Sequence, residues 1–430
     1  MLPVLPVEIW ERVIDHLWEW PLWLSRCALV CRVWHVRSHF HLVSRTTLSN
    51  SQQTHRFAKL LKSHPELRRQ VEWVLICDAT FVRDGVSSMD ERRPMAHIGA
   101  FAAMLAKALP ADPAMRFLKI ADAEWKPGMM HRNTLIHLSA FAGISGLSLY
   151  HVTFPSKAIL SRLICALPNL VLLECASVVC QNKASNPSLY CAASPRVKKL
   201  MLDGPSDDVA DLIGLQPGIV GGLEMLWAGW SRILLGECPS SSAIAVILQH
   251  AGSALKCVDI RLQQLPGTTV DGEHTEGALT AANHPLRALR HCTELEVFCL
   301  AYCLPTTAGS ITISSPQSPN WLYDTLANIT SAKLHGLHLN IDVRHIEDVG
   351  TSCLIDLVHG FLDELQCTQI DKMLAREARF KRLKRFGIYL LCGPQTPAPD
   401  EESWRAAVFA KFPELCARRM LSGEVLVRMD

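Results

Sequence analysis

A short apolar pattern that recurs along most of the chain constrains its fold more than any other feature. Each copy has apolar residues at positions i, i+3 and i+5, as in Leu295, Phe298 and Leu300. Two apolar residues two apart are typical of a strand with one buried face, because alternate side chains point to opposite faces. The second positions of the copies are residues 74, 118, 147, 170, 200, 226, 258, 298, 337 and 386. The sequence therefore predicts a short strand every 23 to 49 residues.

The segments between these strands carry apolar residues at helical spacing. The clearest predicted helices are residues 96–109, 156–167, 207–214, 241–252, 320–330 and 348–366. A repeated strand and helix build a parallel sheet with helices outside it, in which neighbouring units bury each other's apolar faces. We therefore predict an α/β fold with an irregular solenoid over residues 71–393. A compact doubly wound α/β domain with the same spacing by chance is the alternative.

Residues 5–42 differ from the rest of the chain because they are helical without strands. Ile9, Val13 and Leu17 recur every four residues with charged residues opposite them, which predicts an amphipathic helix of about three turns. A second apolar stripe runs from Leu24 to Trp34. Fewer than about 45 residues cannot bury enough surface to be stable alone. This three-helix piece is therefore expected to need a partner that covers its apolar side.

The same stretch resembles the F-box. The residues that carry the resemblance are Leu5, Pro6, Glu8, Ile9, Val13, Ile14, Leu17, Leu24, Cys27, Ala28, Leu29, Val30, Cys31, Arg32 and Trp34. The resemblance implies docking onto the Skp-type adaptor of a cullin–RING ubiquitin ligase, while the rest of the chain selects what is ubiquitinated. It departs at Trp23, where the family often has an acidic residue or serine before the second helix. An ordinary helical hairpin that caps a core is the alternative.

The resemblance also implies domain boundaries and a set of residues that contact the adaptor. We expect an F-box at 1–45, a connecting helix at 46–70, the solenoid at 71–393 and a C-terminal cap of one helix and one strand at 394–430. The expected adaptor contacts are Leu5, Pro6, Ile9, Leu17, Leu24, Val30 and Trp34.

Two copies of the apolar pattern extend to a cysteine and resemble the leucine-rich repeat. They are Leu167, Leu170, Leu172 and Cys175 in one copy, and Leu295, Phe298, Leu300 and Cys303 in the other. The whole array resembles the degenerate leucine-rich domain of many fungal F-box proteins. That resemblance implies a wall of strands behind which the helices stack.

The residues beside the buried strand positions are expected to form the surface that holds a protein substrate. Trp, Tyr and Arg are enriched at binding hot spots, so we predict that Trp227, Arg261, Arg385 and Tyr389 contact it. Residues 376–385 contain six basic side chains. They could bind an acidic or phosphorylated segment, or they could simply favour a helix end and a solvated strand start.

Composition limits the partners and the compartment. The net charge of +2 from 43 basic and 41 acidic residues predicts binding to neither nucleic acid nor membrane. Glu8, Glu11 and Arg12 interrupt any apolar run near the N-terminus, so we expect no secretory signal. We therefore expect a location in the cytoplasm or nucleus, with the 16 cysteines as reduced thiols.

Motifs for catalysis or metal binding are missing from the sequence. It contains no GxGxxG, GxxxxGK[ST], HExxH or GxSxG. Cys27 and Cys31 stand four apart, with His35 and His39 continuing the series, but small buried side chains in a helix explain them better than a metal. We therefore expect no catalytic residues, no cofactor and no metal.

These observations predict a non-enzymatic substrate receptor of a ubiquitin ligase. Its partners would be the Skp-type adaptor, a cullin reached through that adaptor, and a protein substrate that the sequence does not identify. An adaptor-bound interaction or scaffold protein without a ubiquitination role is the alternative. An α/β hydrolase or transferase would need a pocket with convergent polar groups at strand ends.

Overall fold

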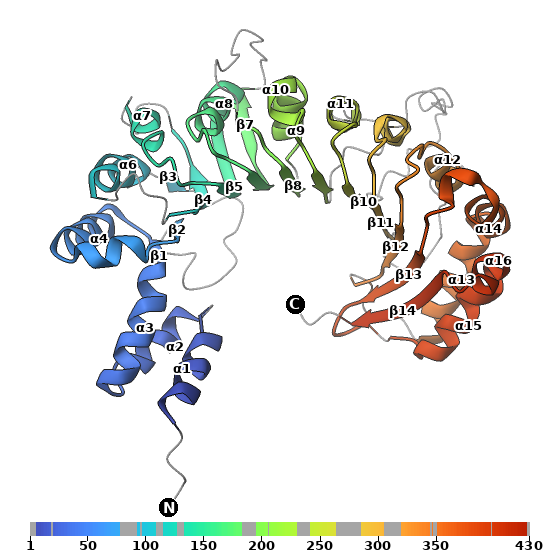
Figure 1. The fold of residues 1–430 in the computed structure, drawn as a ribbon, viewed down its shortest axis with the longest axis horizontal. Helices are drawn as coiled ribbons and strands as arrows, with labels where there is room; N and C mark the ends of the chain where they lie inside the picture. The colour runs from blue at the N-terminus through green and yellow to red at the C-terminus, as the bar shows by residue number, and fades with distance from the viewer. Residues whose placement is uncertain are drawn as a thin grey trace, which may run out of the picture. The chain divides into compact units, whose positions relative to one another are not determined.

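The structure is a computed structural model. It describes residues 6–18, 20–77, 93–94, 97–108, 115–126, 133–182, 195–204, 206–229, 241–263, 285–304, 320–344, 346, 351–396 and 398–427. The chain divides into two compact units, unit 1 (Met1–Pro195) and unit 2 (Arg196–Asp430). Each unit has a parallel sheet with helices, so the predicted α/β class is confirmed (Figure 1).

Three helices open unit 1: α1 (Val7–His16), α2 (Pro21–Cys27) and α3 (Arg32–Ser44). Pro21 occupies the first turn of α2, where its missing N–H costs no hydrogen bond. Residues 28–31 are not helical, so the second apolar stripe of the sequence is divided between α2 and α3. Trp23 therefore lies inside α2 and not before it, and no side chain caps this helix.

The sheet of unit 1 contains parallel strands that follow the chain order. They are β1 (Arg45–Leu48), β2 (Trp73–Ile76), β4 (Phe117–Glu124), β5 (Gly146–Ser156) and β6 (Leu172–Ala176), with β3 (Arg93–Pro94) beside β4 and β7 (Val179–Asn182) beside β5. Its helices are α4 (Ser51–Ser63), η1 (Pro65–Arg69), α6 (His97–Ala108), α7 (Thr134–Leu138) and α8 (Lys157–Cys165). Figure 1 shows α4, α6, α7 and α8 on one side of this sheet.

Strand β1 was not predicted, because Thr46 and Thr47 interrupt its apolar pattern. It begins directly after α3 and pairs with β2. The connecting helix α4 was predicted; it begins where the Asn50 side chain accepts a hydrogen bond of 2.8 Å from the Gln53 N–H.

Unit 2 also has parallel strands in chain order. They are β8 (Lys199–Asp203), β9 (Met225–Ala228), β10 (Cys257–Gln263), β11 (Val297–Cys303), β12 (Gly336–Asp342), β13 (Arg385–Cys392) and β14 (Leu421–Val427). Its helices are α9 (Asp207–Gly214), α10 (Pro217–Val220), α11 (Ser241–Ala251), η5 (Pro285–His291), α12 (Trp321–Ala327), α13 (Thr351–Glu364), α14 (Cys367–Arg376), η6 (Ala378–Phe380), α15 (Glu401–Lys411) and α16 (Pro413–Ala417). In Figure 1 these helices lie on one side of their sheet.

The strand order shows that neither unit is a doubly wound domain. A doubly wound sheet reverses its strand order and has helices on both faces. Among the described strands, each unit instead adds one strand after another, and one face of each sheet carries no helix (Figure 1). We call this helix-free side the open face.

The register of the strands agrees with nine of the ten predicted copies. Leu118 lies opposite Leu147, and Phe298 lies opposite Leu337, and all four side chains are buried. Buried positions thus run straight across neighbouring strands and form the core beneath the helices.

The copy assigned to Leu167, Leu170 and Leu172 is wrong by three residues. On β6, Leu173 lies opposite Leu147 and Cys175 lies opposite Leu149. The buried set is therefore Leu170, Leu173 and Cys175, whereas Leu172 is only half-buried. Both triplets fit the apolar spacing, so only pairing with β5 decides between them.

Candidate functional site

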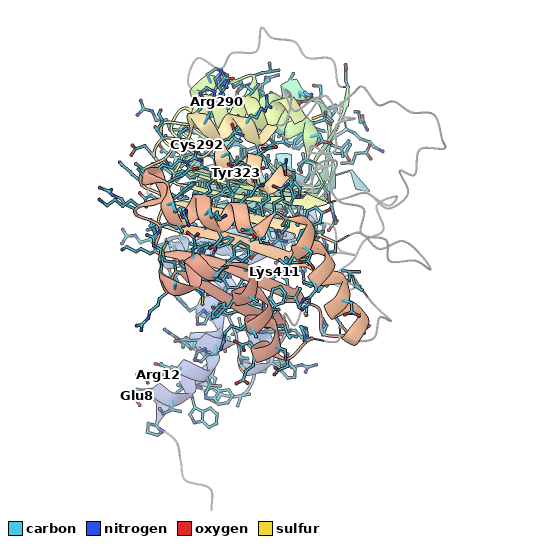
Figure 2. The ribbon with its side chains drawn as sticks, turned by 90° about the vertical axis from the view of Figure 1, so that its right-hand side faces the viewer. Glu8, Arg12, Arg290, Cys292, Tyr323 and Lys411 are labelled. Atoms are coloured by element: carbon cyan, nitrogen blue, oxygen red, sulfur yellow. The ribbon has the colours of Figure 1, made fainter. Side chains whose placement is uncertain are left out.

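Helices α1–α3 expose most of the large apolar side chains found on the surface. Of fifteen such exposed side chains among the described residues, eleven lie on or between these helices. They are Val7, Ile9, Val13, Trp20, Leu22, Trp23, Leu29, Val30, Val33, Val36 and Phe40. We call this set the apolar surface. Contiguous exposed apolar patches often mark contact sites for another macromolecule, whereas single exposed apolar side chains are common. The charged side chains of Glu8 and Arg12 project outward from α1 (Figure 2).

The predicted adaptor contacts Pro6, Ile9 and Val30 are exposed on this piece. Val30 lies between α2 and α3 and retains 62% of its exposure. These residues remain available to a partner. The sequence missed Trp20, Leu22 and several others of the apolar surface, because they lie outside the motif that carries the resemblance.

The other predicted adaptor contacts are less exposed or lie outside the described residues. Leu24 is 1% exposed, so it is buried in this helical piece. Leu17 and Trp34 are half-buried, and the Trp34 ring packs 4.9 Å from the Trp10 ring. Leu5 lies outside the described residues.

An ion-pair network fixes α1 against α3. The Arg37 guanidinium donates two hydrogen bonds of 2.6 Å to the Asp15 carboxylate, and His41 Nε2 lies 2.7 Å from the same group. The Arg37 hydrogen bond in particular lowers the pKa of Asp15 to about 2. This bidentate geometry joins α1 to α3.

Arg45 links the helical piece to the sheet of unit 1. Its guanidinium lies 3.4 Å from the centroid of the Trp18 ring and 5.9 Å from the centroid of the Trp73 ring. Cation–π contact with both rings ties the end of α1 to β2.

The second predicted surface is the open face of unit 2, where Trp227 and Arg261 lie on neighbouring strands. The Arg261 guanidinium is 5.0 Å from the centroid of the Trp227 ring, and both side chains are half-buried. Asp259 lies opposite Trp227 on β10. Two of the four predicted substrate residues thus form one stacked pair that remains partly accessible.

The other two predicted substrate residues are engaged within the chain. Arg385 donates hydrogen bonds to Glu424 (2.6 Å) and Ser422 (3.1 Å) on β14. Tyr389 is 9% exposed, so most of its side chain is covered within the chain. Its ring lies over Gly387, where an added Cβ would clash with Tyr389 Cε2. Because glycine has no side chain, the ring can lie flat on its own strand.

The basic run at 376–385 is partly structural. Arg376 pairs with Glu414, and Arg379 Nη1 donates to the carbonyl oxygens of Ala327 (2.6 Å) and Ile329 (3.0 Å). With Arg385 also paired, half of the six basic side chains hold elements together. This favours the structural interpretation of the run over an anion-binding patch.

The described part of the chain contains neither a metal-binding cluster nor a membrane-spanning helix. No group of three or more His, Cys, Asp or Glu side chains there is placed to hold a metal ion. No helix in the same residues is long and apolar enough to cross a bilayer.

Among the described residues, twelve cysteines are free thiols. Burial raises the pKa of Cys299 and of Cys303 to about 12. Cys165 is an exception to the prediction of reduced thiols, because it is disulfide-bonded, and its partner is not among the described side chains. Sequence spacing could not indicate this bond, because it depends on the fold.

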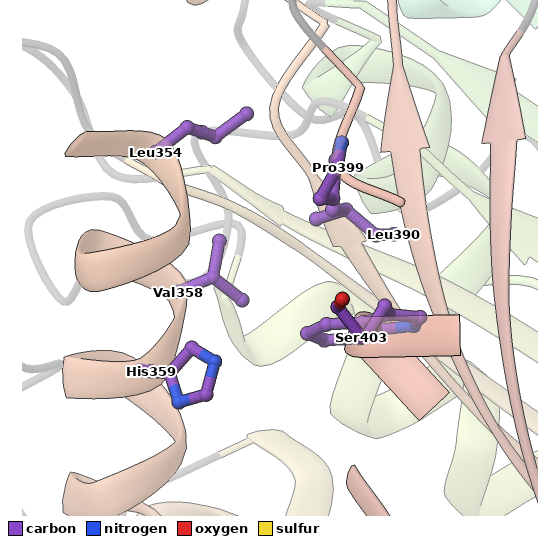
Figure 3. A pocket seen from close by; sticks show the side chains of 7 residues that line it. Leu354, Val358, His359, Leu390, Pro399 and Ser403 are labelled. Atoms are coloured by element: carbon purple, nitrogen blue, oxygen red, sulfur yellow. The ribbon is translucent and has the colours of Figure 1, made fainter. Parts of the chain in front are cut away.

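Figure 3 shows a small pocket between α13, β13 and α15. Leu354, Val358, Leu390 and Pro399 supply apolar walls, and its volume is about 30 Å³. A space of this size holds one or two water molecules, whereas ligand pockets measure about 300–1,000 Å³. We therefore do not assign it as a ligand site.

Comparisons with known proteins do not assign a family. No family model matches this chain, and no curated protein matches it. One similar solved structure is that of a Bacteroides fragilis protein from the Northeast Structural Genomics Consortium. It is 13% identical with a TM-score of 0.31, and the match covers 81% of this chain and 71% of that chain.

Proposed function

We propose that this protein is a substrate-receptor subunit of an SCF-type cullin–RING ubiquitin ligase. Helices α1–α3 would bind the Skp-type adaptor, and the open face of unit 2 would bind a protein substrate. The observation that carries the proposal is the apolar surface: eleven exposed large apolar side chains on the piece that resembles the F-box. A standard interface takes about 20–30 residues from each partner, which this piece can supply.

The proposed architecture is an F-box followed by a degenerate leucine-rich-repeat solenoid. The steps from Leu147 to Leu173, Leu200 and Leu226 are 26, 27 and 26 residues. They support the proposal because about 20–29 residues are typical of this repeat. The sequential parallel strands and the open face are also what such a solenoid would need.

The proposed mechanism is proximity. A receptor that holds a substrate near a ubiquitin-charged enzyme in the same complex makes their encounter effectively intramolecular. The chain itself would then need no catalytic group for ubiquitin transfer, and it would work in the cytoplasm or nucleus.

The test is binding of the purified Skp-type adaptor to variants of the apolar surface. Leu22→Glu with Val30→Glu should weaken binding by at least about tenfold, because both side chains are exposed and buried charges oppose association. Ile136→Glu is the matched control, since Ile136 is 66% exposed on α7, away from the motif. Unchanged binding by the double variant would refute the adaptor site.

Recruitment of the cullin separates the receptor from a scaffold. The receptor predicts a ternary complex of chain, adaptor and cullin on size-exclusion chromatography. A complex with the adaptor that excludes the cullin would support the scaffold alternative instead.

A further inference from the structure

Three residues in unit 1 share an unusual backbone conformation at the same level of adjacent strands. Asp122, His151 and Ser177 have φ angles of 49°, 51° and 53°. The residues just before them pair with one another across β4, β5 and β6, so the three lie side by side. Positive φ is uncommon for residues with a side chain, and such residues cluster at functional sites.

The first two residues of this row are in contact. His151 Nδ1 lies 3.2 Å from Asp122 Oδ1, and Asp122 is 5% exposed. A carboxylate can only accept, so Nδ1 donates the hydrogen bond to Asp122. The buried carboxylate therefore fixes the tautomer in which Nε2 keeps its lone pair. The His151 side chain retains 24% of its exposure.

The third residue, Ser177, follows β6 and is the neighbour of His151 on the next strand. Adjacent strands are about 4.8 Å apart, so Ser177 and His151 are neighbours along the backbone, and the proposed role requires the Ser177 hydroxyl to turn toward the imidazole. Ser177 is 7% exposed. Hydrogen bonds between a catalytic base and its nucleophile are often long in a free enzyme.

We propose that Ser177, His151 and Asp122 form a nucleophile, a general base and a positioning carboxylate that hydrolyse small neutral esters. This activity is independent of the proposed adaptor binding. The three roles follow the Ser-His-Asp pattern, which is recognised by geometry and not by sequence position. A hydrolytic nucleophile on a strained turn after a strand is also the arrangement of the GxSxG enzymes.

The proposed reaction has two balanced steps. His151 Nε2 takes the Ser177 hydroxyl proton while Oγ attacks the ester carbonyl; the ester C–O bond breaks, and the alcohol leaves with that proton. Water then attacks the acyl-serine, gives one proton through His151 to Ser177 Oγ, and releases the carboxylic acid. No oxidant, reductant or further reactant is needed.

A fluorophosphonate probe and p-nitrophenyl acetate test the proposal on the full chain. The probe should label Ser177, as identified by peptide mass spectrometry. Ser177→Gly should abolish labelling and esterase turnover while tolerating positive φ. His151→Asn, which also tolerates this conformation, should lower turnover by about 10²–10⁴-fold. Ser139→Ala, at an exposed serine after α7, is the matched control and should keep both signals.

The positioning role of Asp122 has its own measurement. Asp122→Asn tolerates positive φ but removes the negative charge that fixes the imidazole tautomer. It should lower kcat for p-nitrophenyl acetate with little change in KM, at an unchanged melting temperature. Wild-type protein that is neither labelled at Ser177 nor faster than Ser177→Gly would overturn the proposal. The three positive-φ residues would then have only a structural role, in bending the strands.

Discussion

Replacing Leu173 by alanine tests the strand register that overturns the sequence prediction for β6. Leu173 is fully buried, and it lies opposite Leu147 in the core beneath the helices. The carbons removed are worth about 2.4 kcal/mol of transfer free energy. If the cavity left by the substitution does not collapse, the free energy of unfolding should fall by about 2–5 kcal/mol in total. Leu172→Ala, on the half-buried open face, should cost less than about 1 kcal/mol.

Native-state hydrogen exchange is the suitable assay, because a chain of two units need not unfold in one step. Peptides that cover β5 and β6 report the opening free energy of unit 1 by itself. Leu200→Ala and Met201→Ala on β8 are the matched control pair, since predicted and observed registers agree there. A loss from Leu172→Ala as large as that from Leu173→Ala would refute the assigned register.

Three further predictions concern charges and thiols. A hydrogen bond from Arg37 lowers the pKa of Asp15 to about 2. The ion pair therefore contributes its full stabilisation of the folded state above the unfolded-state pKa of ~4, and this contribution is lost as the pH falls toward about 2. Melting temperatures of wild type and Asp15→Asn should converge over that range; a constant difference would contradict it. Arg379→Ala should destabilise unit 2 by about 1–3 kcal/mol in urea unfolding, because two carbonyl groups lose their donor, whereas exposed Arg382→Ala should change it by less than about 0.5 kcal/mol. Iodoacetamide at pH 8 should alkylate exposed Cys31 well before Cys303, whose pKa burial raises to about 12; equal rates by mass spectrometry would argue against that burial.

Much of the fold could be predicted from local patterns. The i, i+3, i+5 spacing located nine strands in the correct register, and all six helices predicted between them are present. Local periodicity suffices here because one face of each strand and one stripe of each helix must be buried. It failed at β6, where two overlapping triplets fit equally well and only pairing with β5 selects Leu173.

The candidate sites depended more on contacts that are distant in the sequence. Leu24 fits the motif but is buried between helices, and Tyr389 is covered because Gly387 leaves room for its ring. Asp122 and His151 are 29 residues apart, so no short motif could join them. Side chains that meet only through strand pairing leave no signal in a single sequence.

The central claim is that α1–α3 dock onto a Skp-type adaptor, and light scattering coupled to size-exclusion chromatography tests it most directly. The purified full chain and the purified adaptor would be mixed at about micromolar concentrations, where a standard-size interface is expected to hold. The account predicts one peak with the mass of a 1:1 complex, because the apolar surface is then covered. Two separate peaks with the masses of the free proteins would contradict it.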